Sequence, residues 1–149
     1  MPNYLFRPLA RTQKKLNFSA IKALADASDA SQTATAIRLV ETDHTPSMPV
    51  CHGPQGRKWF VRSHSVPDRW FPQDSLDAES YAFGIQFSAN PDSPMLRKIG
   101  ADAWFDRMGA DRFEIQEQTI RVGPDETLTL LVFCDAGMLE EQDCRAYRR

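Results

Sequence analysis

Apolar residues recur every three to four positions over residues 19–41, which is the spacing of one face of an α-helix. Ser19 is in position to cap a first helix over about residues 20–28. Ser31 offers a second cap, and the apolar stripe that follows it continues to about Glu41, before prolines exclude further helix. The apolar positions of the two stripes are Ile21, Leu24, Ala25, Ala34, Ile37, Leu39 and Val40.

The two predicted helices are joined by a tight turn at Ala27–Ala30. Residues 3–15 add a further candidate helix with apolar side chains on one side. Helix-turn-helix units have this length and shape. We therefore expect a helix-turn-helix-like segment over residues 1–45.

The pattern changes to short β-prone runs after residue 46. Two turn sequences, Gly53–Gly56 and Gly123–Glu126, each lie between two of these runs and predict two β-hairpins. A helix capped by Ser75 or Asp77 and running toward Phe87 is expected between them. The predicted strands are residues 48–52, 58–63, 101–105, 113–122 and 127–134.

Two details refine the expected sheet. The alternation of apolar and polar residues in the run 113–122 breaks at Glu117, for which a β-bulge is one explanation. Leu128–Phe133 is nearly continuous in apolar residues, which predicts a central strand covered on both faces. The predicted class is α+β: an antiparallel sheet of about five strands with one or two covering helices over residues 46–137, then a polar tail over 138–149.

Composition agrees with a globular chain. The 149 residues are 42% hydrophobic and 26% charged, and the longest uninterrupted apolar stretch is five residues, so no membrane span is expected. The first residues are basic but have no apolar core of a secretory signal, and we expect a cytoplasmic protein. Residues 1–41 have a net charge of +3 and the remainder −5, which is too little positive charge to require nucleic acid.

The cysteines and histidines predict neither a disulfide framework nor a metal site. Cys51, Cys134 and Cys144 are an odd set without a CxxC pair, so we expect reduced thiols. Four potential zinc ligands lie within 21 residues, but their spacing matches no ordinary site, and we expect no metal and no cofactor. These potential ligands are His44, Cys51, His52 and His64.

Ser19–Asp26 and Gln32–Glu41, followed by Gly56–Ser63, resemble the non-catalytic C-terminal part of the ImmA/IrrE family of zinc metallo-endopeptidases. The opening Met1–Phe6 is similar to the stretch just after that family's catalytic helices. The resemblance implies that a helix-turn-helix-like segment follows a peptidase core, and that a GAF-like sensory domain lies beyond it.

The family's zinc-binding HExxH motif does not occur in this sequence. None of the three histidines is followed by Glu, and none lies four residues from another. No ligand or general base is therefore carried over, and no serine-nucleophile, phosphate-binding or dinucleotide-binding motif occurs either. We expect a non-catalytic regulatory or sensory module that binds a small ligand or a protein partner, such as a repressor or the peptidase domain. A further interpretation is that the chain is a domain left by a truncated gene and has no activity of its own.

A GAF-like or PAS-like sheet commonly buries a small ligand between its concave face and the covering helices or loops. The candidate lining residues are Cys51, Trp59, Arg62, Tyr81, Trp104 and Phe133. The alternative is that these aromatic residues are plain core. Cys51 is a candidate redox-active thiol if it is exposed near Arg57 or Arg62, since a cation favours the thiolate.

The alternative function is a DNA-binding helix-turn-helix transcriptional regulator. Its nucleic-acid contacts would come from Lys14, Lys15, Gln32 and Arg38, with Thr33 and Thr35 as further base-reading positions. The helix after Ser31 has no Lys or Arg in its first turn and is rich in alanine, which favours packing over DNA contact. DNA binding is therefore disfavoured.

Overall fold

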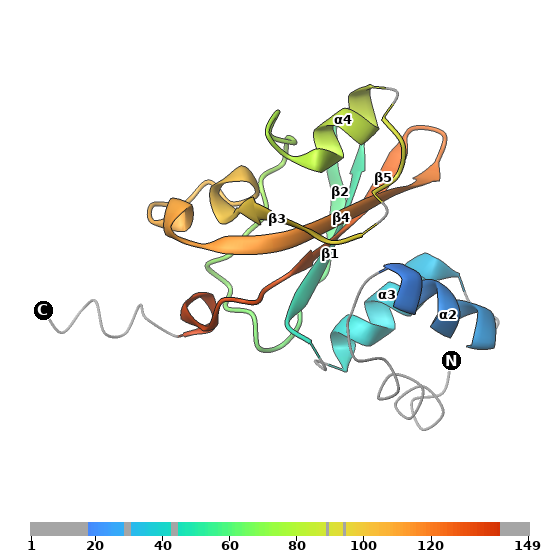
Figure 1. The fold of residues 1–149 in the computed structure, drawn as a ribbon, viewed down its shortest axis with the longest axis horizontal. Helices are drawn as coiled ribbons and strands as arrows, with labels where there is room; N and C mark the ends of the chain where they lie inside the picture. The colour runs from blue at the N-terminus through green and yellow to red at the C-terminus, as the bar shows by residue number, and fades with distance from the viewer. Residues whose placement is uncertain (1–17, 29–30, 43–44, 89, 94, 141–149) are drawn as a thin grey trace, which may run out of the picture.

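The computed structural model describes residues 18–28, 31–42, 45–88, 90–93 and 95–140, and it has the α+β architecture that the sequence predicts (Figure 1). A five-stranded antiparallel sheet is formed by β1 (Ser47–Gly53), β2 (Gly56–Phe60), β3 (Arg97–Gly100), β4 (Glu114–Gly123) and β5 (Glu126–Val132). Within these described ranges, the α-helices are α2 (Phe18–Ser28), α3 (Gln32–Glu41) and α4 (Tyr81–Phe87). Three short 3₁₀ helices are η1 (Ala101–Ala103), η2 (Ala110–Arg112) and η3 (Ala136–Leu139).

The strands are ordered β2-β1-β5-β4-β3, so the first and last strands of the chain are neighbours at the centre. Both predicted hairpins are confirmed, with Gly53 opposite Gly56 and Gly123 opposite Glu126. The prediction that the apolar run after residue 127 lies centrally is also confirmed, because β5 pairs with β1 on one side and β4 on the other.

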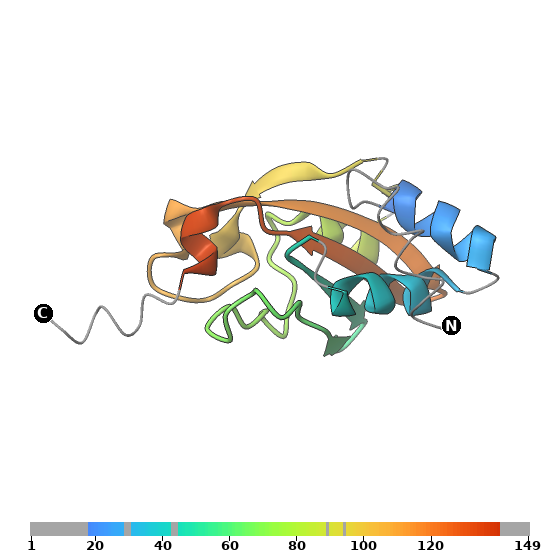
Figure 2. The same cartoon turned by 90° about the horizontal axis from the view of Figure 1, so that it is seen from below.

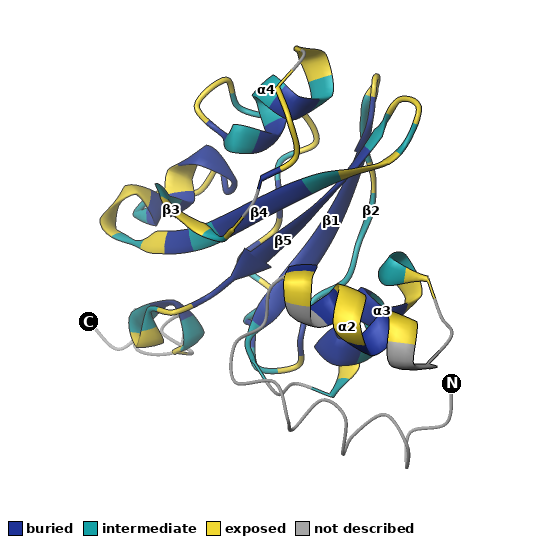
Figure 3. Cartoon of the chain, turned by 45° about the vertical axis from the view of Figure 1, so that its right-hand side comes forward, coloured by how far each residue is buried: buried dark blue, intermediate teal, exposed yellow. Residues whose placement is uncertain are grey.

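The sheet has a core on each face. On one face, α2 and α3 pack over a cluster that includes Leu128 and Leu130. On the other face, α4, the loops of residues 61–80 and the 3₁₀ helices enclose a second cluster around Trp104 and Phe105. Figure 1 shows α4 and the α2–α3 pair on different sides of the sheet, and Figure 2 shows the same layers from below. In Figure 3, β1 and β5 are buried along most of their length, while α2 has exposed outer positions.

The α2–α3 pair begins differently from the prediction. Ser19 lies inside α2 and does not cap it, because the helix starts at Phe18. The main-chain N–H of Phe18 donates to Oε1 of Gln118 on β4 at 2.9 Å, so the sheet satisfies one of the amides that a capping residue would otherwise satisfy. Ser31 does cap α3, since its side chain accepts the N–H of Ala34 at 3.1 Å.

Three sequence predictions about the sheet are wrong. Residues 101–105 do not form a strand: they include η1 and turn inward, and the strand at this edge is Arg97–Gly100. The second strand ends at Phe60 and not at residue 63. No bulge lies at Glu117, which pairs with Leu131 in register; the irregularity of β4 falls between Arg121 and Gly123.

The segment of residues 18–41 and the sheet share one core, since Ile21 and Leu24 pack in the same cluster as Leu128. The expected helix over residues 3–15 and most of the expected tail lie outside the described residues. Among the helices of the described ranges, none is both long and apolar enough to cross a membrane.

Candidate ligand site

A buried carboxylate lies beneath the first turn of α4. Glu117 on β4 is fully buried, and its carboxylate accepts the main-chain N–H of Ala82 at 2.7 Å and that of Tyr81 at 3.3 Å. These are the first two residues of α4, whose N–H groups have no partner within the helix. Glu117 therefore fastens the start of α4 to the sheet.

The same carboxylate accepts two side-chain donors. Nε1 of Trp104 donates to Oε1 at 3.0 Å, and Oγ1 of Thr119 donates to Oε2 at 3.3 Å. Thr119 also shares a hydrogen bond of 2.7 Å with Thr129 on β5. We call Glu117, Trp104, Thr119 and Thr129 the Glu117 cluster; it is a polar group of side chains within an otherwise apolar core.

His52 on β1 adjoins this cluster. Its ring lies 5.7 Å from the ring of Trp104, edge to face, and the residue is 1% exposed. Neither ring nitrogen forms a hydrogen bond of good geometry with a described residue, although the main chain of Gln73 lies close enough to favour the protonated ring. The imidazole is therefore a buried polar group that the described residues leave without a well-formed hydrogen bond.

Burial shifts the titration of both groups toward the neutral form. Burial raises the pKa of Glu117, while the hydrogen bonds from Trp104, the main chain of α4 and Thr119 oppose that rise. Burial, with a contribution from Arg57, lowers the pKa of His52 to about 4, although the main chain of Gln73 and the charge of Asp74 act in the opposite direction. His52 is accordingly a neutral imidazole at physiological pH.

A cavity of about 310 Å³ lies beside α4, between the helix and residues 90–93. Tyr81 links it to the Glu117 cluster, because its main-chain N–H donates to Glu117 while the residue also lines the cavity. The guanidinium of Arg97 lies 5.2 Å from the centre of the Tyr81 ring, and Asp92 lines the cavity as well. The cavity thus has an aromatic residue and charged groups of both signs.

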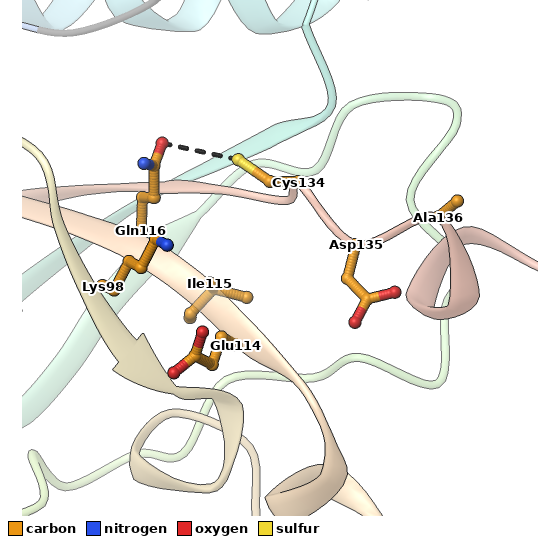
Figure 4. A pocket seen from close by; sticks show the side chains of 7 residues that line it. All are labelled: Lys98, Glu114, Ile115, Gln116, Cys134, Asp135 and Ala136. Carbon is orange, nitrogen blue, oxygen red and sulfur yellow. Dashed lines mark hydrogen bonds between the residues drawn. The ribbon is translucent and has the colours of Figure 1, made fainter.

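A second cavity of about 360 Å³ lies at the end of the sheet and is drawn in Figure 4. Lys98, Glu114 and Gln116 line it, and Gln116 accepts a hydrogen bond from the Cys134 thiol with an S···O distance of 3.4 Å. Asp135, also in the lining, accepts the N–H of Gly137 and so caps η3. Among the described residues that line this cavity, none belongs to the Glu117 cluster, so the two sites are separate.

The six lining residues predicted from the sequence do not come together in one place. Trp104 and Phe133 are buried in the core beneath α4, and Tyr81 lies on α4 itself. Cys51 and Trp59 pair with each other across β1 and β2 and pack in the cluster under α2 and α3, on the opposite face. The sheet therefore separates the predicted residues into two groups.

Arg62 lies outside both groups, in the loop after β2. Its Nη2 donates to the main-chain oxygen of Trp70 at 3.0 Å, and its guanidinium lies 5.2 Å from the centre of the Phe60 ring. These contacts hold the loop of residues 61–71 against the sheet. The arginine has a structural role in this arrangement.

Cys51 is 2% exposed, so the exposure that the redox hypothesis requires is absent. Burial and the nearby carboxylate of Glu126 raise the pKa of its thiol, while Lys58 lowers it. Of the histidines weighed as metal ligands, His64 is exposed and His44 lies outside the described residues. In the described ranges, no group of three or more His, Cys, Asp or Glu side chains is arranged to hold a metal.

The residues proposed to contact nucleic acid differ in how accessible they are. Thr35 is fully buried, and its hydroxyl donates to the main-chain oxygen of Ser31, so it cannot reach a base. Arg38 forms an ion pair with Glu41 at 3.6 Å, and Gln32 is half-buried. Lys14 and Lys15 lie outside the described residues.

Sequence reasoning did not identify Glu117 or His52 as members of a buried site. The signal for Glu117 was the break in apolar alternation, which marks a polar residue that points into the core. The signal for His52 was its place in a β-prone run two residues after Val50, which puts both side chains on the same face of the strand. A comparison of the chain with known proteins finds no matching family model and no matching curated protein.

Proposed function

We propose that this chain is a non-catalytic regulatory module that binds a small polar ligand on the face of the sheet beneath α4. In this proposal, α2 and α3 are the helix-turn-helix-like segment and the sheet is the GAF-like or PAS-like sensory part, as in the C-terminal region that the sequence resembles. The observation that carries the proposal is the buried His52, which has no well-formed hydrogen bond to a described residue and lies beside a carboxylate that anchors α4.

The strand order and its covering elements support the sensory assignment. One face of the five-stranded antiparallel sheet is covered by a short helix and long loops and not by a long helix, which suits entry of a ligand. The buried polar groups would orient that ligand, while the apolar residues of the same core, Phe105 and Phe133 among them, supply apolar surface. A hydrophobic core that serves only for packing would not require these buried polar groups.

A ligand bound at this face would affect the contacts that hold the start of α4. A donor or acceptor that bonds to His52 would lie next to Trp104, which is bonded to Glu117. Any change in the position of Glu117 changes the anchoring of Tyr81 and Ala82 at the start of α4. Ligand binding is thus coupled to the position of α4, an element that a partner can detect.

The experiment is a thermal-shift screen of nucleotides and small metabolites, followed by calorimetric titration of any compound that raises the melting temperature. We expect a saturable ligand for the wild type, with affinity reduced at least about tenfold in His52→Phe, since loss of one buried hydrogen bond costs about 1–3 kcal/mol.

The matched control is Cys134→Ser, which changes the separate cavity of Figure 4 and should leave the affinity unchanged. A hit that binds His52→Phe as tightly as the wild type would place the ligand elsewhere. A screen without any saturable hit would count against small-ligand sensing and favour the protein-partner version of the proposal, in which a repressor or a peptidase domain is the partner.

A further inference from the structure

Figure 2 shows η3 and the turn of residues 105–113 at one end of the molecule. Three arginines line a small pocket in this region. The pocket has a volume of about 150 Å³ and is lined by Arg69, Arg107 and Arg112 together with the aromatic residues Trp70 and Phe113. Of the described residues, no carboxylate side chain contributes to this lining. The pocket is distinct from the Glu117 cluster and from the cavity beside α4.

Arg69 is held in place by the main chain. Its Nη2 donates to the main-chain oxygens of Met138, at 3.2 Å, and Glu140, and its guanidinium lies 5.4 Å from the centre of the Trp70 ring. Both hydrogen bonds use one of the three guanidinium nitrogens. A guanidinium carries five N–H donors, so Nε and Nη1 of a prepositioned Arg69 remain for a ligand.

Arg107 and Arg112 are brought to the same pocket by a turn. Gly109 between them has a φ of 89°, a left-handed conformation that favours glycine, and Ala110 is fully buried and anchors the turn. The main-chain N–H of Ala110 donates to the oxygen of Arg107, and that of Arg112 to the oxygen of Gly109. The turn therefore holds the main chain of Arg107 and Arg112 where both side chains line the pocket.

Three arginine side chains line one small pocket, where a bound anion would be attracted by all three positive charges. Guanidinium groups match the oxygen geometry of phosphate, and charge-assisted hydrogen bonds of this kind are among the strongest in proteins. A volume of about 150 Å³ suits a compact group and not a whole nucleotide. We propose that this pocket binds a phosphate group, either the free ion or the phosphate of a small phosphomonoester.

The test is a titration of the full chain with inorganic phosphate at constant ionic strength, followed by NMR. The reporters are the amide of Gly109 and the indole N–H of Trp70, which donates to Met138 at the edge of the pocket. A local readout is needed because phosphate stabilises folded proteins in general through exclusion from their surface. We expect saturable shifts at both reporters and none with equivalent chloride.

Arg112→Gln should weaken phosphate binding about tenfold or more, because one charge-assisted interaction is lost. Lys22→Gln is the matched control, since it removes one positive charge from an exposed position on α2 and should leave binding unchanged. Arg107→Gln provides a second variant if Arg112→Gln does not fold, which the melting transition would show. Arg69 is not replaced, because its contacts with η3 are structural.

A second titration with ribose 5-phosphate distinguishes the two sources of the phosphate group. Binding of the free ion alone, or of both compounds, supports the pocket and identifies what it admits. Shifts that do not saturate, or that weaken equally in Lys22→Gln, would overturn the proposal. Neither result bears on the ligand proposed for the face beneath α4, because the variants here leave His52 and Glu117 intact.

Discussion

Replacement of the buried His52 by phenylalanine should make the protein less sensitive to acid. The folded protein holds the pKa of His52 at about 4, against about 6.5 for an unperturbed histidine, so the unfolded chain binds the proton first as the pH falls. The wild type therefore loses stability as the pH falls from above 6.5 toward 4. At pH 5 these two values give a loss of about 2 kcal/mol relative to pH 7.5.

Phenylalanine keeps the ring contact with Trp104 but has no nitrogen to protonate or to leave unpaired. At pH 7.5 we expect His52→Phe to have a free energy of unfolding equal to or above that of the wild type, because an unsatisfied buried polar group is removed. At pH 5 the variant should gain a further advantage of about 2 kcal/mol over the wild type.

Urea unfolding followed by tryptophan fluorescence at pH 7.5, 6 and 5 measures this difference. With a denaturant slope of about 2 kcal/mol/M, the midpoint of the variant should rise by about 1 M relative to the wild type between pH 7.5 and 5. His64→Gln is the control, since it replaces an exposed histidine. A difference between His52→Phe and the wild type that stays constant with pH would refute the reasoning, as would an NMR titration of His52 with its midpoint near 6.5.

Three other substitutions test the fold. Glu117→Gln should gain stability relative to the wild type as the pH rises above about 4.5, because burial raises the pKa of the native carboxyl and ionising it costs stability. Unfolding curves of both proteins from pH 4.5 to 7.5 measure this trend, and a stability advantage of the variant that stays constant or shrinks as the pH rises would contradict it. Ser31→Ala should cost about 1 kcal/mol by removing the cap of α3, with Ser19→Ala as a non-capping control in urea unfolding; equal costs would argue against the cap. Leu128→Ala should cost about 2–5 kcal/mol, because this fully buried side chain joins the central strand to α2 and α3; a loss below about 1 kcal/mol in the same assay would mean that this core is not formed.

The elements with a local signal could be predicted from the sequence. Ser31 has the side chain to cap a helix, and the turn Gly53–Gly56 has the residues that reverse a chain, so their positions needed no tertiary information. The apolar run from Leu128 likewise indicated a central strand, because only a strand covered on both faces needs apolar residues at successive positions.

The elements that depend on distant contacts could not be predicted from the sequence. The start of α2 at Phe18 depends on Gln118, which is 100 residues away. The edge strand β3 is polar and short, whereas the apolar residues just after it fill the core as a 3₁₀ turn; Trp104 and Phe105 therefore suggested a strand in the wrong place.

Which candidate residues lie near one another could not be predicted for a similar reason. Trp104 and Tyr81 were among the candidates and both contact Glu117, but which face of the sheet each strand residue occupies depends on the register between strands. Cys51 and His52 are adjacent and point to opposite faces, so a single sequence could not tell which one lies near Trp104.

The position of β5 between β1 and β4 determines when this protein can fold during its synthesis. β1 ends at Gly53, but its main partner begins at Glu126, so the two strands that form the middle of the sheet are separated by more than seventy residues of chain. Closing a loop of that length before any central pairing forms slows folding. On the ribosome, β1 and the apolar side of α2 remain without β5 until nearly all of the sheet's residues have been translated. The nascent chain is therefore most exposed to aggregation and to chaperones in this interval.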